Sequence, residues 1–151
     1  CRPICRLIVV VDLVMTFVID TSALLRLYLA DGLLPAALEP AMAQGCSGAA
    51  TLLVPDLCLL ECASVLRKQV LRGTMTSEES MALLADLLLL PLRTVAAVEL
   101  VCDAFELALR HSLSVYDATY LALALRHGAQ LITADGDLAT AAANCGCHTA
   151  R

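Results

Sequence analysis

Short β-rich apolar segments alternate along the chain with longer segments in which apolar residues recur at helical spacing. Strands are predicted at residues 16–19, 51–54, 92–95 and 130–133, with an edge strand at 148–149. Helices are predicted at residues 22–29, 33–43, 57–72, 77–90, 96–111 and 114–127, followed by a short one that begins at 135 or 136. This alternation predicts an α/β fold whose mostly parallel sheet is covered by helices on both faces.

Capping residues define the predicted ends of three helices. Asp56, which follows Pro55, is predicted to be the N-cap of the helix at 57–72. Thr76 and Glu79 have the spacing of a capping box, and Gly128 is the expected C-terminal stop of the helix at 114–127.

The composition is that of one globular domain. The chain has 151 residues, of which 60% are hydrophobic and 17% charged, so it is not disordered and has material for a core. No run of about 18 or more uncharged apolar residues occurs. The nearest candidate, residues 7–19, is too short and contains Asp12. We therefore expect no transmembrane helix and no cleaved signal peptide. Residues 1–14 are either an N-terminal extension or the product of a misplaced start, and a single domain is predicted at 15–151.

The net charge of −5 counts modestly against a nucleic-acid ligand, because domains that bind nucleic acids are more commonly basic. It does not exclude one, since a few clustered Arg and Lys side chains beside a bound metal ion can hold phosphates locally.

The eight cysteines lack the spacing of a disulfide framework. Cys58, Cys62 and Cys102 lie in apolar helical segments, where a free cysteine behaves as a small apolar residue, and this favours a reducing, cytoplasmic location. Cys145, Cys147 and His148 are a weak candidate for a metal or redox cluster, because no second ligand pair with zinc spacing follows them.

Four carboxylates lie in apolar surroundings: Asp20, Glu61, Asp117 and Asp135. A buried carboxylate without a partner costs several kcal/mol or takes a raised pKa, so each of them needs a partner. Each also has a purely structural explanation. Asp20 and Asp135 could cap the helices that follow them, and Asp117 could complete a capping box with Ser114. Glu61 is too deep in its helix to be a cap, but it could pair with an arginine.

The positions of the four acids favour a shared site. Two follow strands and two lie near the starts of helices, places that face the same edge of a parallel sheet. Carboxylates gathered there would repel one another, and a divalent cation removes that conflict. An all-oxygen site suits Mg²⁺ or Mn²⁺ better than zinc, and such a site can activate water and stabilise charge on a phosphodiester.

Four stretches of the chain resemble the PIN-domain nucleases, and most of all the VapC-type toxins of toxin–antitoxin pairs. They are Val-Ile-Asp-Thr-Ser at residues 18–22, Glu61 early in its helix, Ser-Val-Tyr-Asp-Ala-Thr-Tyr at the start of 114–124, and Leu-Ile-Thr-Ala-Asp-Gly-Asp-Leu at 131–138. The resemblance extends over residues 15–149. It implies a three-layer α/β/α sandwich around a sheet of four or five strands.

The resemblance also implies an endoribonuclease that depends on Mg²⁺ or Mn²⁺. By motif position, Asp20, Glu61, Asp117 and Asp135 match the acidic quartet of the family. We expect Asp20 and Asp117 to hold the main metal ion, and hydrolysis to leave a 5′-phosphate and a 3′-hydroxyl. The residues that match ligand- or water-orienting positions are Thr21, Ser22 and Thr133, with Asp137 as a further acid for which helix capping is the alternative. Arg67, Lys68 and Arg72 are candidate phosphate contacts, with a solvated helix end as the alternative.

The family typically forms homodimers and is inhibited by a cognate antitoxin protein, so the resemblance implies both partners in addition to RNA. The apolar helices between residues 33 and 90 are expected to supply these surfaces. The main alternative is a catalytically silent PIN-like binding module, and a purely structural domain is a further one. A haloacid-dehalogenase-type phosphatase needs a second aspartate where Ser22 stands, and a nucleotide-binding fold needs a Gly-rich loop after the first strand.

Overall fold

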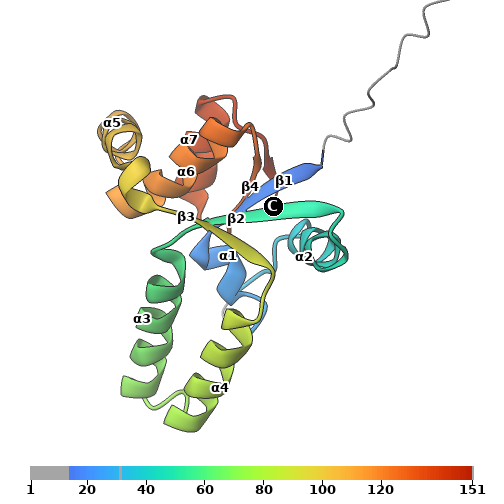
Figure 1. The fold of residues 1–151 in the computed structure, drawn as a ribbon. Helices are drawn as coiled ribbons and strands as arrows, with labels where there is room; N and C mark the ends of the chain where they lie inside the picture. Colours follow the sequence, from blue (N-terminus) through green and yellow to red (C-terminus); the bar gives the residue numbers. More distant parts are fainter. Residues whose placement is uncertain (1–13, 31, 151) are drawn as a thin grey trace, which may run out of the picture.

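Five parallel strands form one sheet in the order β3-β2-β1-β4-β5, with β1 at its centre (Figure 1). The structure is a computed structural model, and it describes residues 14–30 and 32–150. The strands are β1 (Met15–Ile19), β2 (Ala50–Pro55), β3 (Leu92–Val95), β4 (Gln130–Ile132) and β5 (Thr149–Ala150). All of the predicted strands are therefore confirmed, with ends that differ by at most one residue.

Helices cover both faces of the sheet, which confirms the predicted α/β/α sandwich (Figure 1). One face carries α6 (Val115–His127) and α7 (Gly136–Asn144), and α5 (Val101–His111) packs against α6. The other face carries α1 (Thr21–Leu25), α2 (Leu38–Ser47) and α3 (Cys58–Leu71). Helix α4 (Ser77–Leu88) packs against α3, and Figure 1 shows this pair extending away from the sheet.

The central strands are buried on both of their faces, as expected of a parallel sheet between two helical layers. Val18, Ile19, Val54, Leu131 and Ile132 are all 0% exposed. Helix α6 is also internal, because every side chain from Ala118 to Ala124 is buried between the sheet and α5. An apolar helix of this kind has no solvent face along its middle.

Three helix predictions are corrected. The helix predicted at 33–43 begins only at Leu38, because Pro40 is tolerated in the first turn of a helix but not in its interior. The helix predicted at 22–29 ends at Leu25. The helix predicted at 96–111 is split into a short 3₁₀ segment, η1 (Ala97–Glu99), and α5.

The predicted caps have mixed outcomes. The capping box of Thr76 and Glu79 and the left-handed C-cap at Gly128, with φ of 57°, are both confirmed. The N-cap prediction for Asp56 is wrong, since the N-cap of α3 is Leu57. The Asp56 carboxylate instead accepts a hydrogen bond from the amide of Ala97 at 3.0 Å, which ties the start of α3 to the segment after β3.

The N-terminal extension predicted at residues 1–14 lies, apart from Val14, outside the described residues. Within residues 14–30 and 32–150, no helix has both the length and the apolar character needed to cross a membrane. The six cysteines in this part of the chain are free thiols.

Candidate active site

The carboxyl ends of β1 and β4 lie next to each other, because the amide of Asp20 donates to the carbonyl of Ile132 at 2.9 Å. Asp20 follows β1 directly, and Thr133 follows β4. A cavity of about 610 Å³ opens at this edge of the sheet. All four of the predicted acids line it: Asp20, Glu61, Asp117 and Asp135.

Asp20 is the most deeply buried of these acids, with 3% of its surface exposed. Its Oδ2 accepts hydrogen bonds from the hydroxyls of Ser22 and Thr133, the latter at 2.8 Å. Burial raises the pKa of the Asp20 carboxyl to about 6; the two hydroxyls oppose this shift, while the negative charges of Asp117 and Glu61 add to it. The capping explanation for Asp20 is wrong, because no amide of α1 binds its side chain.

A network of short hydrogen bonds fixes this part of the site. Ser22 Oγ accepts from the amide of Ala134 at 3.0 Å, and Thr133 Oγ1 accepts from the amide of Asp135 at 3.0 Å. The two hydroxyls thus connect the end of β1 to the turn that follows β4. We call Asp20, Ser22, Thr133 and Asp135 the strand side of the site.

The remaining two aspartates lie at the starts of helices. Asp135 Oδ1 accepts from the amide of Leu138 at 2.8 Å, so its predicted capping role is confirmed, yet it also lines the cavity. Ser114 caps α6 by accepting from the amide of Asp117 at 3.0 Å, and its hydroxyl donates to Asp117 Oδ2 at 2.6 Å. Ser114 is thus the N-cap as predicted, but Asp117 does not complete the capping box, because its carboxylate binds the Ser114 hydroxyl rather than the Ser114 amide. Capping and contribution to the site coincide at Asp135.

Glu61 lies in the first turn of α3, opposite α6. Its Oε2 accepts hydrogen bonds from Thr21 Oγ1 at 2.9 Å and from the Tyr120 hydroxyl. Thr21 Oγ1 and the Tyr120 hydroxyl are also 2.6 Å apart. Burial raises the pKa of the Tyr120 phenol, which therefore keeps its proton and acts as a donor. Within the described residues, the partners of the Glu61 carboxylate are these two hydroxyls rather than the arginine considered from the sequence. We call Glu61, Thr21 and Tyr120 the helix side of the site.

The four carboxylates share a pattern of hydrogen bonding. Each is bound through one oxygen only: Oδ2 of Asp20 and Asp117, Oε2 of Glu61 and Oδ1 of Asp135. Within the described residues, no hydrogen bond reaches the second oxygen of any of them. Hydroxyl and amide donors on one oxygen, with the other oxygen left for a ligand, are typical of carboxylates that bind metal ions.

The donor set suits a hard divalent cation, because it consists only of carboxylate and hydroxyl oxygens. In the part of the chain that the structure describes, no three acidic, histidine or cysteine side chains are grouped closely enough to hold one ion directly. The arrangement therefore fits a cation that keeps several water molecules and contacts some of the acids through them, as Mg²⁺ commonly does.

A family model of the PIN domain matches residues 17–144 of the chain. The chain belongs to the PIN-domain family. Ribonuclease VapC3 of Pyrobaculum aerophilum is 35% identical over 127 residues, a match that covers 83% of this chain and 93% of the relative. This PIN domain is thus of the VapC type, as its sequence motifs predict.

Two crystal structures share its fold. The protein PAE2754 of Pyrobaculum aerophilum superimposes with a TM-score of 0.64 at 19% identity, over 90% of this chain and 84% of that one. VapC20 of Mycobacterium tuberculosis, described as a sarcin-ricin loop cleaving toxin, gives a TM-score of 0.60 at 23% identity, over 83% and 94% of the two chains.

Of the four residues predicted to orient ligands or water, three lie at the site of the PIN domain and one does not. Thr21, Ser22 and Thr133 all donate hydrogen bonds to the carboxylates of the site. Asp137 is exposed and lines a different cavity, together with His111. The structure therefore does not bring Asp137 to the four acids.

The cysteine-rich segment near the C-terminus is not a metal cluster in the described structure. Cys145 Sγ lies 3.2 Å from His111 Nε2, whereas Cys147 Sγ is directed to the carbonyl of Ala129 at 3.7 Å. The two thiols therefore have different neighbours.

Sequence reasoning missed Tyr120 as a residue of the PIN-domain site. Tyr120 lies in the apolar middle of α6 and is 0% exposed, so its spacing alone suggests a core residue. A signal was present, because a buried tyrosine hydroxyl needs a hydrogen-bond partner, and Glu61 was an acid in an apolar helix segment that also needed one.

Proposed function

We propose that this PIN domain is an endoribonuclease that depends on a divalent metal ion, Mg²⁺ or Mn²⁺, and that it is the toxin of a type II toxin–antitoxin pair. The observation that carries the proposal is the convergence of Asp20, Glu61, Asp117 and Asp135 on one cavity, with one oxygen of each left for a ligand. The 35% identity to Ribonuclease VapC3 supports RNA as the substrate.

Asp20 and Asp117 are proposed to hold the ion, with Glu61 and Asp135 binding it directly or through water. A bound Mg²⁺ or Mn²⁺ supplies an activated water and neutralises charge on the phosphodiester. The protein keeps the carboxylates in place: Ser22 and Thr133 orient Asp20, and the helix side orients Glu61. Such supporting hydrogen bonds fix the direction of the oxygen that remains available.

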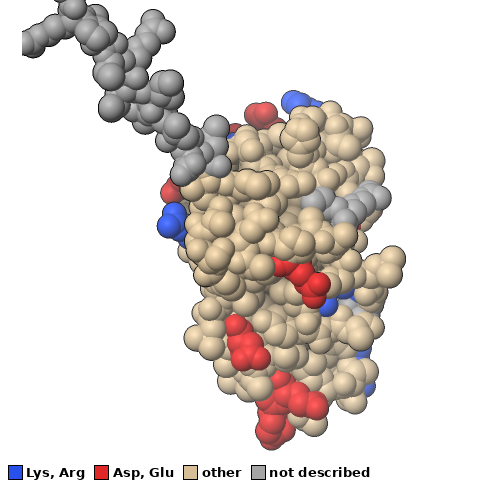
Figure 2. All heavy atoms as spheres, turned by 90° about the vertical axis from the view of Figure 1, so that its right-hand side faces the viewer, with Lys and Arg blue, Asp and Glu red and all other residues tan. Residues whose placement is uncertain are grey.

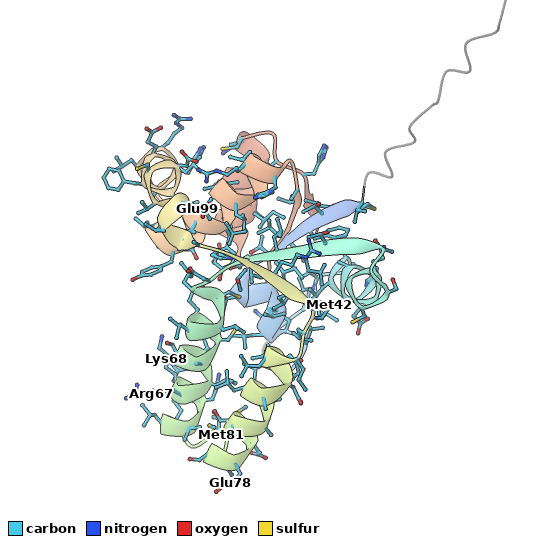
Figure 3. The ribbon with its side chains drawn as sticks, in the orientation of Figure 1. Met42, Arg67, Lys68, Glu78, Met81 and Glu99 are labelled. Atoms are coloured by element: carbon cyan, nitrogen blue, oxygen red, sulfur yellow. The ribbon has the colours of Figure 1, made fainter. Side chains whose placement is uncertain are left out.

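Two cationic side chains line the cavity, Arg26 and Lys68, and Lys68 is the one proposed to meet the RNA backbone. Lys68 lines the cavity from α3, two turns beyond Glu61 on the same side of that helix. Figure 3 shows Arg67 and Lys68 on the side of α3 that faces away from α4, while Glu78 marks the start of α4. Figure 2 shows acidic side chains gathered toward that end of the molecule. RNA is therefore proposed to approach along α3, where its phosphates meet positive charge.

The proposed partners are a cognate antitoxin and a second copy of the chain. Several large apolar side chains on α3 and α4 are exposed and offer surfaces for such contacts: Leu60, Leu71, Met81 and Leu88. The protein is proposed to act in the cytoplasm, which its six described free thiols support.

The proposal is tested by incubating the purified protein with total RNA in Mg²⁺, in Mn²⁺ and in EDTA, with Asp20→Ala as the control variant. We expect cuts that need the metal ion, vanish in the variant and leave 5′-phosphate ends. Cleavage that persists equally in EDTA and in the variant would contradict the proposed site. Absence of cleavage in all conditions would favour the silent binding module.

A further inference from the structure

One wall of the active-site cavity is apolar and is not used by the four acids. The residues of this wall are Tyr116 on α6, Leu60 on α3 and Leu57, the N-cap of α3. Tyr116 is 63% exposed and Leu60 is 72% exposed. Single exposed apolar side chains are common on protein surfaces. Here, however, an aromatic ring and a leucine from two different helices border the same cavity as the carboxylates.

The helix geometry places Tyr116 directly beside the site. Tyr116 precedes Asp117 in the chain and lies one turn before Tyr120, so the two tyrosines share one side of α6. Tyr120 reaches Glu61 on α3, and this side of α6 therefore faces α3. Tyr116 lies one turn nearer the start of α6, lines the cavity and, unlike Tyr120, is exposed to solvent.

Tyr116 has no structural role that would explain its position. Its side chain is exposed rather than packed in the core. Within the described residues its hydroxyl makes no hydrogen bond, in contrast to the hydroxyl of Tyr120, which binds Glu61. What the position offers is an accessible aromatic face next to a carboxylate of the site.

We infer that Tyr116 is a stacking platform for one nucleobase of the RNA substrate, with Leu60 as the apolar edge of the same base pocket. The inference rests on the proposed ribonuclease function and adds to it the form of the substrate. A base stacked on Tyr116 has its own phosphate close to Asp117, the next residue, and so the platform sets which phosphodiester enters the site.

The platform selects for an unpaired base. Proteins recognise single-stranded RNA by stacking splayed bases on aromatic side chains, whereas a base inside a duplex has both faces covered by its neighbours. Stacking tolerates every base, because each has a π-face. The platform therefore demands a single-stranded or flipped nucleotide at the cut, and leaves the choice of sequence to other contacts.

The first test compares steady-state kinetics of Tyr116→Ala, Tyr116→Trp and Leu60→Ala on a short single-stranded RNA that contains a mapped cut. The matched control is Phe105→Ala, since Phe105 is an aromatic residue on α5 that is 55% exposed and does not line the cavity. We expect Tyr116→Ala to raise KM by roughly 5- to 150-fold, the range for loss of one stacked base, with kcat changed much less. Tyr116→Trp retains a low KM. Equal KM values for Tyr116→Ala and Phe105→Ala would overturn the inference.

The second test measures base stacking by fluorescence in a variant that is not expected to cleave RNA. A short single-stranded RNA of mixed sequence with a central 2-aminopurine is bound to the Asp20→Asn protein, and the same RNA annealed to its complement serves as the duplex control. We expect quenching of the 2-aminopurine fluorescence with the single strand only, lost in Asp20→Asn/Tyr116→Ala and kept in Asp20→Asn/Phe105→Ala. Quenching that does not depend on Tyr116 would overturn the platform.

The two tests separate the inference from the function on which it rests. If the wild-type protein cleaves RNA and Tyr116→Ala behaves like the control, the platform is wrong and the nuclease stands. If the wild-type protein cleaves no RNA, the proposed nuclease function fails. The fluorescence measurement then decides for or against the platform by itself.

Discussion

The strand side and the helix side of the site hold their carboxylates in different ways. On the strand side, the backbone places Asp20, because it follows the central strand and its amide binds the end of β4, and the nearby Ser22 and Thr133 hydroxyls then orient its carboxylate. On the helix side, Glu61 is positioned by side chains, since Thr21 and Tyr120 reach it from two other helices. The strand side is thus a product of sheet topology, and the helix side a product of packing between α1, α3 and α6.

This difference implies different sensitivities to mutation. The backbone of the strand side keeps its arrangement when a single side chain is changed, so changes there alter chemistry and charge. Both sides use hydroxyl groups, but the hydroxyls that hold Glu61 come from two other helices, with no sheet backbone to place it, and loss of one leaves a buried polar group without its partner. Four substitutions test this comparison, from the largest expected effect to the smallest.

Asp117→Asn should have the largest effect, because Asp117 is proposed to bind the metal ion between the two sides. We expect RNA cleavage to fall by more than about 100-fold, beyond the range for an outer-shell partner of a metal ligand. The fold should persist, since Ser114 caps α6 through the backbone amide of residue 117. Single-turnover cleavage and circular dichroism measure the two quantities. Asp103→Asn, an exposed acid on α5, is the control, and a wild-type rate in Asp117→Asn would contradict the assignment.

Asp20→Asn should change how stability depends on pH. The pKa of Asp20 is raised from 3.8 to about 6 in the folded protein, so the folded state binds the proton more tightly than the unfolded state. The stability linked to this proton is complete below pH 3.8 and is lost as the pH rises through about 6. The loss amounts to about 3 kcal/mol.

Urea unfolding in EDTA, with and without the substitution, measures this effect. The free energy of unfolding of the wild-type protein should fall relative to that of Asp20→Asn as the pH rises, and the variant should be the more stable protein at neutral pH. Two pH profiles that run parallel would show that Asp20 is not destabilised by burial.

Tyr120→Phe should impair the helix side without removing any carboxylate. Replacing a residue that hydrogen-bonds to a metal ligand typically lowers metal affinity or activity by about 10- to 100-fold. We expect RNA cleavage to fall within this range. Thr119→Val is the matched control, because the Thr119 hydroxyl is buried in the same helix but donates to the carbonyl of Val115, away from the site. Equal losses in both variants would mean that Tyr120 acts only through the stability of α6.

Lys68→Ala should have the smallest effect. Loss of one phosphate contact lowers the slope of log affinity against log salt by about 0.7 for single-stranded nucleic acid, with a modest loss of affinity. RNA binding measured over a range of salt concentrations gives this slope. Arg110→Ala, on α5 and at a different cavity, is the control. An unchanged slope for Lys68→Ala would place the RNA elsewhere.

The fold was largely predictable because its strands are short apolar runs between helices of regular spacing. Two of the errors have local causes and one has a tertiary cause. Pro40 delays the start of α2, and Leu100 separates η1 from α5 in a segment that reads as one continuous helix. Asp56 has the residue type of an N-cap, yet a tertiary hydrogen bond to Ala97 takes its carboxylate away from α3. A tertiary contact of this kind leaves no mark in local sequence.

The strand side was also predictable, since an acid at a strand end reveals its position through chain order alone. The helix side was not. Glu61 was recognised as an acid in an apolar helix, but its partners Thr21 and Tyr120 are 40 and 59 residues distant in the chain. Several buried hydroxyls could reach a given carboxylate. The angle at which the helices cross decides which one does, and the sequence does not determine this angle.

The most direct test of the account is calorimetric titration of Mn²⁺ into the protein and into the double variant Asp20→Asn/Asp117→Asn. The cavity is proposed to be the metal site, so the wild-type protein should release or absorb heat in a saturable transition that the double variant lacks. Identical titrations of the two proteins would show that these carboxylates do not bind the metal ion, and would contradict the proposed nuclease site.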